Sequence, residues 1–254
     1  MMFNGRVFAC ADLHGRLDLY QKIKEFLQPE DTVYFLGDAC DRGPNSWETV
    51  KAIARDPQFI YLFGNHEDMM VNSLAPLYLD SDYYDHDAYY LWLNNGGGIT
   101  EQQITEDINP GVFIRHIAKR PVMETYQNKN GKIIYLSHAG FTPAAKMPSK
   151  RDMIWDRYHI MEGWPDDYDD VIVVHGHTPI PYMSRYEPWG FLDKEDEYAI
   201  YSGSKKVTPK GAVWYADGHK VNLDCGAVWT GKTVLLDLDT FEQHIFEIKG
   251  DDNG

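Results

Sequence analysis

Five short polar clusters, each placed directly after a run of apolar residues, constrain the fold of this chain more than any other feature. They are Asp12-Leu-His14-Gly, Gly37-Asp38-Ala-Cys-Asp41-Arg42-Gly43, Gly64-Asn65-His66-Glu67, Ser137-His138-Ala-Gly140 and His175-Gly-His177-Thr-Pro179. In an open α/β sheet the loops that follow the strands meet in one crevice, so such clusters converge although they lie far apart in sequence. The arrangement predicts an α/β fold with one polar site at the carboxyl ends of its strands.

The first part of the chain predicts a βαβαβ unit with parallel strands. Short apolar runs predict strands over residues 7–11, 32–36 and 59–63. Helical spacing of apolar residues predicts helices over 17–27 and 47–55 between them. Strands that alternate with helices in this way are typical of a parallel sheet.

The rest of the chain predicts more strands and two insertions. The further strands are expected at residues 122–126, 133–136, 171–174, 233–238 and 244–248. The Asn130-Gly131 step is a strong hairpin signal between the first two of them. The last two are expected to form a second hairpin around Asp239-Thr240. The aromatic and acidic stretch 75–110, expected to be partly helical, and the polar stretch 182–220 interrupt the pattern as insertions.

Composition limits the domain organisation and the class of partner. The 254 residues, of which 43% are hydrophobic, suffice for one substantial core, so we expect one domain over residues 1–254. The formal net charge of −15 argues against a nucleic-acid partner, because phosphate backbones require clustered Lys and Arg. Cys10, Cys40 and Cys225 show no CxxC spacing, which argues against disulfides and thiolate metal sites. With no signal peptide or membrane-length apolar run, we expect a cytoplasmic protein with no membrane partner.

The polar clusters offer a set of metal ligands. The candidates are Asp12, His14, Asp38, Asn65, His138 and His177. Asp38 is placed to bridge two cations, which lie about 3.5–4 Å apart in two-metal sites. Carboxylate, amide and imidazole ligands suit Mn, Fe or Zn. A single histidine is more often structural, but five of the ten histidines lie in these clusters, and a structural role does not explain that concentration.

The same clusters contain candidate catalytic residues. Arg42 is placed to bind phosphate oxygens with its forked guanidinium, although an ion pair with Asp41 on the surface is the simpler alternative. His66 is expected to project toward the leaving group, with Asp41 keeping its ring protonated. We interpret Glu67 as the first-turn acid of the helix that follows, in preference to a residue that supports the metal ligands.

A run of three glycines, Gly96-Gly97-Gly98, is the chain's other glycine-rich feature. It lacks the strand before it and the Lys-Ser/Thr after it that a P-loop requires. We therefore expect a tight turn there and no phosphate cradle.

In order along the chain, these motifs resemble those of the calcineurin-like metallophosphoesterases, specifically the phosphoprotein phosphatase branch. The matching patterns are Asp-x-His-Gly, Gly-Asp-x-x-Asp-Arg-Gly, Gly-Asn-His-Glu, Ser-His-Ala-Gly and Gly-His-Thr-Pro. Within that branch the chain is similar to small bacterial and phage serine/threonine phosphatases related to phage lambda phosphatase, and to symmetrical dinucleoside tetraphosphatases. The segments that begin at Trp92 and Leu223 also match, so the resemblance spans roughly residues 6 to 240.

The resemblance implies a fold and a metal centre. The fold would be a four-layer αββα sandwich with mixed sheets, and the cofactors would be two divalent ions, with Mn expected and Fe or Zn as alternatives. The implied ligands are Asp12, His14 and Asp38 for one ion, and Asp38, Asn65, His138 and His177 for the other.

The resemblance also implies roles around the metals. Asp41 and His66 would form an acid pair, and Arg42 and Arg157 would bind phosphate, although a surface arginine among acidic neighbours explains Arg157 equally well. His175 is expected to orient the neighbouring ligand histidine or the phosphate.

The implied activity is hydrolysis of phosphomonoesters, most simply those of serine and threonine in proteins, by direct attack of hydroxide held by the metals and without a phosphoenzyme. Pro179 stands where many nuclease and phosphodiesterase relatives carry a further histidine, which favours this chemistry over DNA cleavage. One alternative is a dinucleoside polyphosphate hydrolase in which aromatic residues of 75–110 stack on a base. Another is an inactive metal-binding interaction module. The expected partner is accordingly a phosphoprotein, a phosphopeptide or a phosphorylated nucleotide.

Overall fold

The computed structural model describes residues 3–79, 85–144, 147–183 and 209–248. Its strands are β1 (Val7–Cys10), β2 (Thr32–Phe35), β3 (Phe59–Tyr61), β4 (Met123–Gln127), β5 (Ile133–Ser137), β6 (Val171–His175), β7 (Val213–Tyr215), β8 (Lys220–Asn222), β9 (Lys232–Asp237) and β10 (Gln243–Glu247). Its α-helices are α1 (Leu17–Phe26), α2 (Ser46–Arg55), α3 (Asn65–Tyr78), α4 (His86–Trp92), α5 (Gly98–Thr105), α6 (Pro110–Ile117), α7 (Lys150–Trp155), α8 (Ile180–Met183) and α10 (Ala227–Thr230). A π-helical turn, η1 (Leu93–Gly97), and 3-10 turns η2 (Tyr158–Met161), η3 (Asp166–Tyr168) and η4 (Ala216–Gly218) complete the elements.

The strands form two mixed sheets. One has the order β10-β9-β1-β2-β3 and the other β4-β5-β6-β8-β7. In the first sheet β1, β2 and β3 are parallel neighbours, which confirms the predicted βαβαβ unit. The two predicted hairpins are also confirmed, since β4 pairs with β5 and β9 with β10 in antiparallel register.

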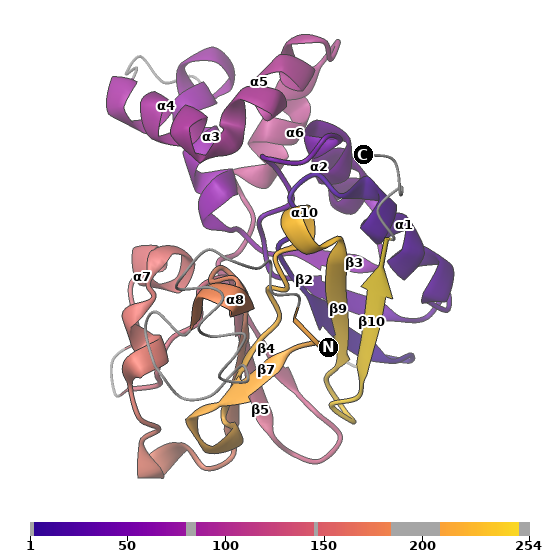
Figure 1. Cartoon of the computed structure of the whole chain (residues 1–254), viewed down its shortest axis with the longest axis vertical. Helices are drawn as coiled ribbons and strands as arrows, with labels where there is room; N and C mark the ends of the chain where they lie inside the picture. The colour runs from indigo at the N-terminus through magenta and orange to yellow at the C-terminus, as the bar shows by residue number, and fades with distance from the viewer. Residues whose placement is uncertain (1–2, 80–84, 145–146, 184–208, 249–254) are drawn as a thin grey trace, which may run out of the picture.

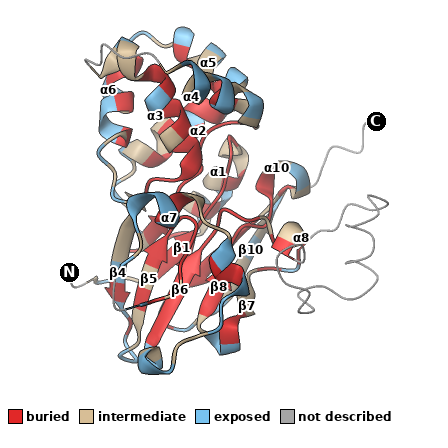
Figure 2. Cartoon of the chain, turned by 90° about the vertical axis from the view of Figure 1, so that its left-hand side faces the viewer, coloured by how far each residue is buried: buried red, intermediate tan, exposed pale blue. Residues whose placement is uncertain are grey.

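The sheets pack face to face, with helices outside them, in the αββα arrangement that was expected (Figure 1). Strand β1 shows the principle, because alternate residues of a strand point to opposite faces. Val7 and Ala9 join an apolar cluster shared with the second sheet, whereas Phe8 and Cys10 pack with residues of helices α1 to α3. Buried residues accordingly run through β1, β5 and β6 in Figure 2.

The insertion predicted over 75–110 is more helical than expected. Helices α3, α4, α5 and α6 gather at one end of the molecule, at the top of Figure 1. At the glycine run the chain kinks within residues 93–97, where Gly96 leaves helical geometry, and it then continues directly into α5, so the expected turn is a kink between two helices. Gly96 has φ +98°, and its carbonyl oxygen accepts the backbone N–H of Arg42, so the run packs against the second polar cluster.

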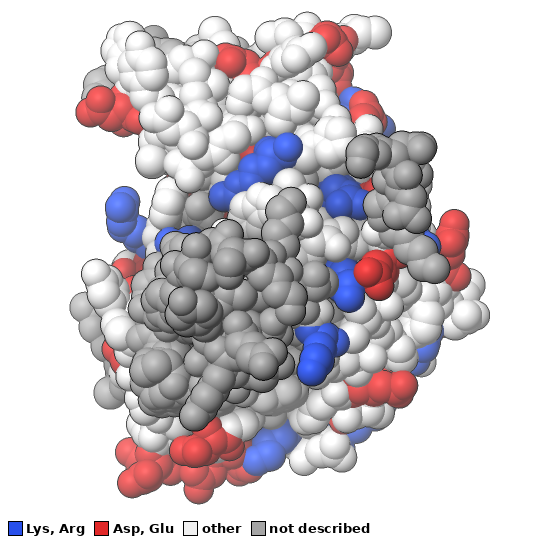
Figure 3. All heavy atoms as spheres, in the orientation of Figure 1, with Lys and Arg blue, Asp and Glu red and all other residues white. Residues whose placement is uncertain are grey.

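The second insertion, over 182–220, lies for the most part outside the described residues. Its described end contributes β7 and β8 to the second sheet. Within the described ranges, no helix combines the length and the apolar character needed to cross a membrane. On the face shown in Figure 3, Lys and Arg atoms form separate spots across the middle of the molecule, and most Asp and Glu atoms lie nearer its edges.

Candidate metal and phosphate site

The polar clusters meet at the strand ends, and their backbone is unusual. Nine described residues other than glycine have positive φ, a left-handed conformation that costs most residues energy. Six of the nine belong to the predicted site: Asp12, His14, Asp38, Asp41, Arg42 and His177. Such strain persists only where the surrounding structure holds it, and it concentrates at functional sites.

The first group of ligand atoms gathers around Asp38, His138, His177 and Asn65. Nε2 of His138 lies 2.9 Å from Oδ1 of Asn65 and 3.3 Å from Oδ2 of Asp38. Nδ1 of His177 lies 2.8 Å from the same Asn65 oxygen. All four residues are buried.

The hydrogen bonds of the outward-facing ring nitrogens determine which ring nitrogens of His138 and His177 can bind a metal. Nδ1 of His138 faces the carbonyl oxygen of Leu36 at 2.8 Å, and Nε2 of His177 faces that of Trp155 at 3.2 Å. A carbonyl oxygen only accepts, so in the neutral rings those nitrogens carry the protons. The inward nitrogens and the Asn65 oxygen then present lone pairs to one another, and a cation is the group that satisfies them all.

The second group contains His14, Asp38 and His66, whose candidate ligand atoms lie within 4.8 Å of one another. Asp12, which the sequence predicted for this group, is not among them, although its carboxylate interacts with the charge of Asp38. Nδ1 of His14 faces the carbonyl oxygen of Cys40 at 2.7 Å, and its Nε2 lies 3.5 Å from Oδ2 of Asp38. Both oxygens of Asp12 accept the backbone N–H of His177 at 3.1 Å, which ties the first cluster to the fifth. Asp38 is common to both groups, as a bridging ligand requires.

Although burial opposes it, Asp38 raises the pKa of His138, whereas the pKa values of the other two candidate ligand histidines shift the opposite way. Burial, with the charges of His138 and Arg157, lowers the pKa of His177 well below its usual range. Burial, with the charge of Arg42, does the same to the pKa of His14. Although burial opposes it, the neighbouring histidines hold the pKa of Asp38 well below its usual range. Imidazole nitrogens and carboxylate oxygens are ligands that fit Mn, Fe or Zn.

Asp41 and His66 form the predicted pair. Oδ2 of Asp41 lies 2.6 Å from Nδ1 of His66, and both side chains are buried. The carboxylate also accepts Nε1–H of Trp92 at 3.0 Å and the hydroxyl of Thr100 at 2.5 Å. Ser46 accepts the backbone N–H of Asp41 at 2.6 Å. The sequence motifs had not identified Thr100 or Ser46 for this site, because both lie outside the five clusters.

Glu67 has a different role from the one we expected. It does occupy the first turn of α3, but its side chain is fully buried and accepts the backbone N–H groups of Asp38 and Ala39, each at 2.8 Å. It also accepts the hydroxyl of Tyr61 at 2.8 Å and the N–H of Gly64 at 2.9 Å. Glu67 therefore supports the loop that carries Asp38, and the helix-dipole interpretation alone is insufficient.

The two arginines have different positions in the site: Arg42 contacts two of its histidines directly, whereas Arg157 acts on His177 through its charge. Arg42 donates to Nε2 of His14 and to Nε2 of His66, each at 2.7 Å, so its guanidinium lies between the metal group and the acid pair. Arg157 is half-buried just before η2, and its charge reaches His177. The ring of Trp229, which is 49% exposed, lies 5.7 Å from the guanidinium carbon of Arg42.

His175 does not orient the ring of His177, contrary to expectation. Its Nε2 lies 2.7 Å from the hydroxyl of Tyr215, and its Nδ1 lies 3.0 Å from the carbonyl oxygen of Gly176. Its ring packs edge-on against His159 at 5.0 Å. Because side chains alternate between the two faces along β6, the side chain of His175 lies toward Tyr215 and His159 and away from the ligand groups.

Asp224 is a buried carboxylate at the site. The sequence motifs had not identified it as a site residue. Burial, opposed by a hydrogen bond from Gly226, raises its pKa to about 6. Burial of Asp12, together with the charge of Asp224, raises the pKa of Asp12 well above its usual range. The signal in the sequence was the Leu223-Asp-Cys-Gly226 segment, which matched the family without indicating a role.

Comparison with known proteins agrees with this geometry. A symmetrical bis(5'-nucleosyl)-tetraphosphatase from Xanthomonas axonopodis pv. citri is 24% identical, over 96% of this chain and 85% of that protein. "Putative serine/threonine-protein phosphatase C27B7.6" of Caenorhabditis elegans is 31% identical over 49% of this chain, which spans only 29% of that protein.

Solved structures share the fold. A Saccharomyces cerevisiae protein serine/threonine phosphatase superposes with a TM-score of 0.53 at 14% identity, over 99% of this chain and 82% of that one. A structure described as a "putative diadenosine tetraphosphatase" gives a TM-score of 0.58 at 14% identity, over 97% and 95% of the two chains. The model of the family described as calcineurin-like phosphoesterase matches residues 5–219. The chain therefore belongs to the calcineurin-like phosphoesterases, which hydrolyse phosphoesters with two divalent metal ions.

Proposed function

We propose that this phosphoesterase removes phosphate from serine and threonine side chains of proteins. The observation that carries the proposal is the buried pair of Asp41 and His66, 2.6 Å apart. A serine or threonine alkoxide is a poor leaving group that must gain a proton as the P–O bond breaks, and a positioned imidazole can supply it. A nucleotide leaving group needs that proton far less, so the pair supports phosphomonoester substrates.

The other tasks fall to neighbouring groups. Arg42 and Arg157 would hold phosphate oxygens through charge-assisted hydrogen bonds. Asp41 fixes the orientation of the His66 ring, and Trp92 in turn fixes Asp41. Two divalent ions bound by the ligand groups would supply a nucleophile from water and draw charge from the phosphoryl oxygens.

A second candidate is symmetrical cleavage of dinucleoside tetraphosphates, and one specific observation favours it. The half-exposed indole of Trp229 stands beside Arg42, where it offers a flat surface to a nucleobase. The aromatic residues of 75–110, to which the sequence assigned base stacking under this alternative, include Trp92, which is buried against Asp41. The full-length Xanthomonas relative bears a tetraphosphatase name, which supports the same candidate.

One assay separates these candidates. The Mn-supplemented protein is given a panel of phosphoserine and phosphothreonine peptides and, in parallel, diadenosine tetraphosphate, with chromatography of the products. Faster release of phosphate from the peptides supports the first proposal, and clean formation of ADP supports the second. Metal binding without hydrolysis of either substrate would refute both and leave the interaction-module hypothesis.

A further inference from the structure

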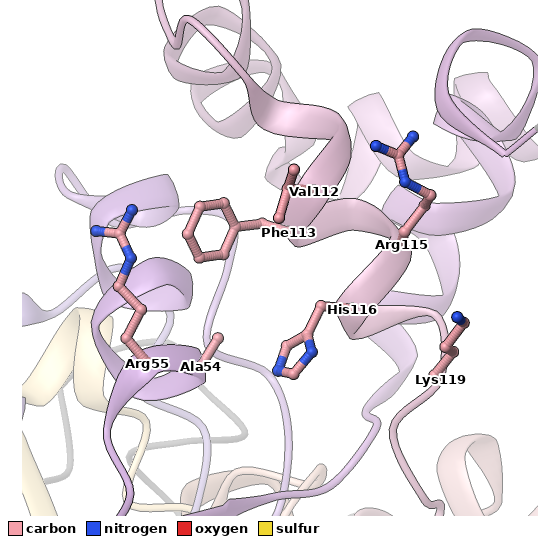
Figure 4. A pocket seen from close by; sticks show the side chains of 7 residues that line it. All are labelled: Ala54, Arg55, Val112, Phe113, Arg115, His116 and Lys119. Atoms are coloured by element: carbon pink, nitrogen blue, oxygen red, sulfur yellow. The ribbon is translucent and has the colours of Figure 1, made fainter.

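A cavity of about 440 Å³ lies between α2 and α6, away from the metal ligands (Figure 4). Its lining combines basic and apolar side chains and contains no carboxylate. The lining residues are Ala54, Arg55, Val112, Phe113, Arg115, His116 and Lys119. Three Lys or Arg residues and a histidine around one cavity are unexpected in a chain with 39 Asp and Glu residues against 24 Lys and Arg residues.

No carboxylate of the described residues neutralises the Arg and Lys side chains of the cavity. Among the described residues, no carboxylate forms an ion pair with Arg55, Arg115 or Lys119, although Arg115 donates to the carbonyl oxygen of Tyr78 at 3.1 Å. The acid next to Arg55 in sequence, Asp56, is already paired with Lys24 at 2.7 Å.

A second acid, Asp107, is also paired within the protein. Asp107 pairs with Lys51 at 2.8 Å and accepts Nε1–H of Trp47. Burial and the charges of Arg120 and Lys119 lower the pKa of His116. The positive field is therefore available to an outside ligand.

The apolar part of the lining is preformed. The ring of Phe113 packs edge-on against buried Trp47 at 6.0 Å, and Arg55 lies over its face at 4.5 Å. Val112 is 49% exposed beside it. In Figure 4, Arg55 stands on one side of Phe113, while Arg115 and Lys119 stand on the other. The cavity thus presents cations at both ends of an apolar centre.

We propose that this cavity docks an acidic segment of a protein partner, with carboxylates on both sides of one apolar or aromatic side chain. The apolar side chain would enter between Val112 and Phe113, and the carboxylates would pair with Arg55 at one end and Lys119 at the other. A cavity of this size holds one or two side chains or a small ligand. An extended peptide uses both cationic ends together, whereas a small anion reaches only one of these exposed ends.

The docking site is separate from the metal site. Ser46, at the start of α2, contacts Asp41, whereas Arg55 ends the same helix. Nine residues of α-helix span about 14 Å. A docked segment therefore leaves the metal and phosphate groups open, and the inference holds for either candidate substrate of the enzyme.

Fluorescence anisotropy of a short labelled peptide, with acidic residues on both sides of a central phenylalanine, tests the inference. We expect saturable binding to the full chain that weakens at higher salt. The double variant Arg55→Glu/Lys119→Glu should weaken binding by about tenfold or more, because like charges then face each other. The control Lys22→Glu/Lys210→Glu makes the same change in net charge at exposed positions elsewhere, and it should alter binding less than about twofold.

Three further measurements make the outcome decisive. Hydrolysis of p-nitrophenyl phosphate should be the same in both double variants and in the presence of peptide, which shows that the site and the fold are intact. Val112→Ser should weaken binding of the phenylalanine peptide but should leave binding of a matched peptide with alanine at its centre unchanged. Equal losses in the two double variants, or displacement of the peptide by ADP at similar concentration, would overturn the assignment to an acidic protein segment.

Discussion

Oε2 of Glu67 lies 2.8 Å from the backbone nitrogen of Asp38, the residue shared by the two ligand groups. The contact joins the first turn of α3 to the loop after β2, where Asp38 has φ +60°. A buried carboxylate that accepts backbone N–H groups stabilises a strained loop, because those donors would otherwise lack partners. Glu67 thus acts on the metal site through the backbone of Asp38.

Glu67→Gln should weaken metal binding without removing a ligand. The amide keeps one acceptor oxygen but places an NH₂ group against backbone donors. Loss of such a supporting contact typically reduces metal affinity by about 10–100-fold. Titration of Mn by calorimetry measures this, with Glu25→Gln, an exposed glutamate of α1, as the control. Unchanged affinity in a folded Glu67→Gln protein would contradict the proposed support.

Asp38→Asn should abolish hydrolysis and leave the fold intact. The amide can still accept the N–H of His66 through Oδ1, a contact of 3.0 Å, but it lacks the charge needed to bridge two cations. Because the metals supply several kcal/mol of transition-state stabilisation, activity should fall by roughly a thousandfold. Turnover and circular dichroism are compared with those of Asp167→Asn, and wild-type turnover in Mn-loaded Asp38→Asn would refute the bridging assignment.

Asp41→Asn should reveal the acid pair through its dependence on the leaving group. Without the carboxylate, the His66 ring loses its anionic partner and its fixed orientation. Proton transfer typically contributes about 10²–10⁴-fold, so kcat for phosphoserine peptides should fall within that range. p-Nitrophenolate leaves without a proton, so kcat for p-nitrophenyl phosphate should change much less. Equal losses for both substrates would argue against general acid catalysis.

Trp229→Ala tests whether the exposed indole binds a base. If it does, KM for diadenosine tetraphosphate should rise by about tenfold, since stacking is worth about 1–3 kcal/mol per base. Trp229→Phe should retain most of the affinity, and KM for phosphopeptides should be unaffected in both. A parallel fall in kcat for every substrate would instead indicate that Trp229 holds Arg42 in place.

Asp31 should make the N-terminal edge of the first sheet sensitive to acid. Its carboxylate accepts Nη2–H of Arg6 at 2.6 Å and the N–H of Gln28 at 2.8 Å. Although burial opposes it, these bonds lower the pKa of Asp31 below its usual value near 3.8. A carboxyl group with a lowered folded-state pKa stabilises the fold above its unfolded pKa, and this stabilisation is lost as pH falls through the folded pKa.

The corresponding measurement is urea unfolding of Asp31→Asn and the wild type at several pH values. At pH 7 the variant should be less stable by about 1–2 kcal/mol, the size of a charge-assisted hydrogen bond with one exposed partner. The difference should shrink below about pH 4 as the wild-type carboxyl group takes up its proton. A difference that stays constant down to pH 3 would show that the charge of Asp31 contributes nothing.

The sequence by itself was sufficient for the N-terminal βαβαβ unit, the two hairpins and the convergence of the polar clusters that carry the candidate ligands. Each of these depends on local information: apolar runs, turn residues and polar side chains at strand ends. Because the loops after parallel strands share one edge, local order was enough to bring Asp12, Asp38 and Asn65 together.

The tertiary structure alone decided which residues support those ligands. Thr100 reaches Asp41 across 59 residues, and Trp229 reaches Arg42 across an even longer separation. The burial of Glu67 under the Asp38 loop and the turn of His175 toward Tyr215 likewise depend on how elements pack, not on their own composition. Contacts between distant segments carry no local pattern, so the five motifs predicted the ligands of the site, and the packing of helices and sheets determined the groups that hold them.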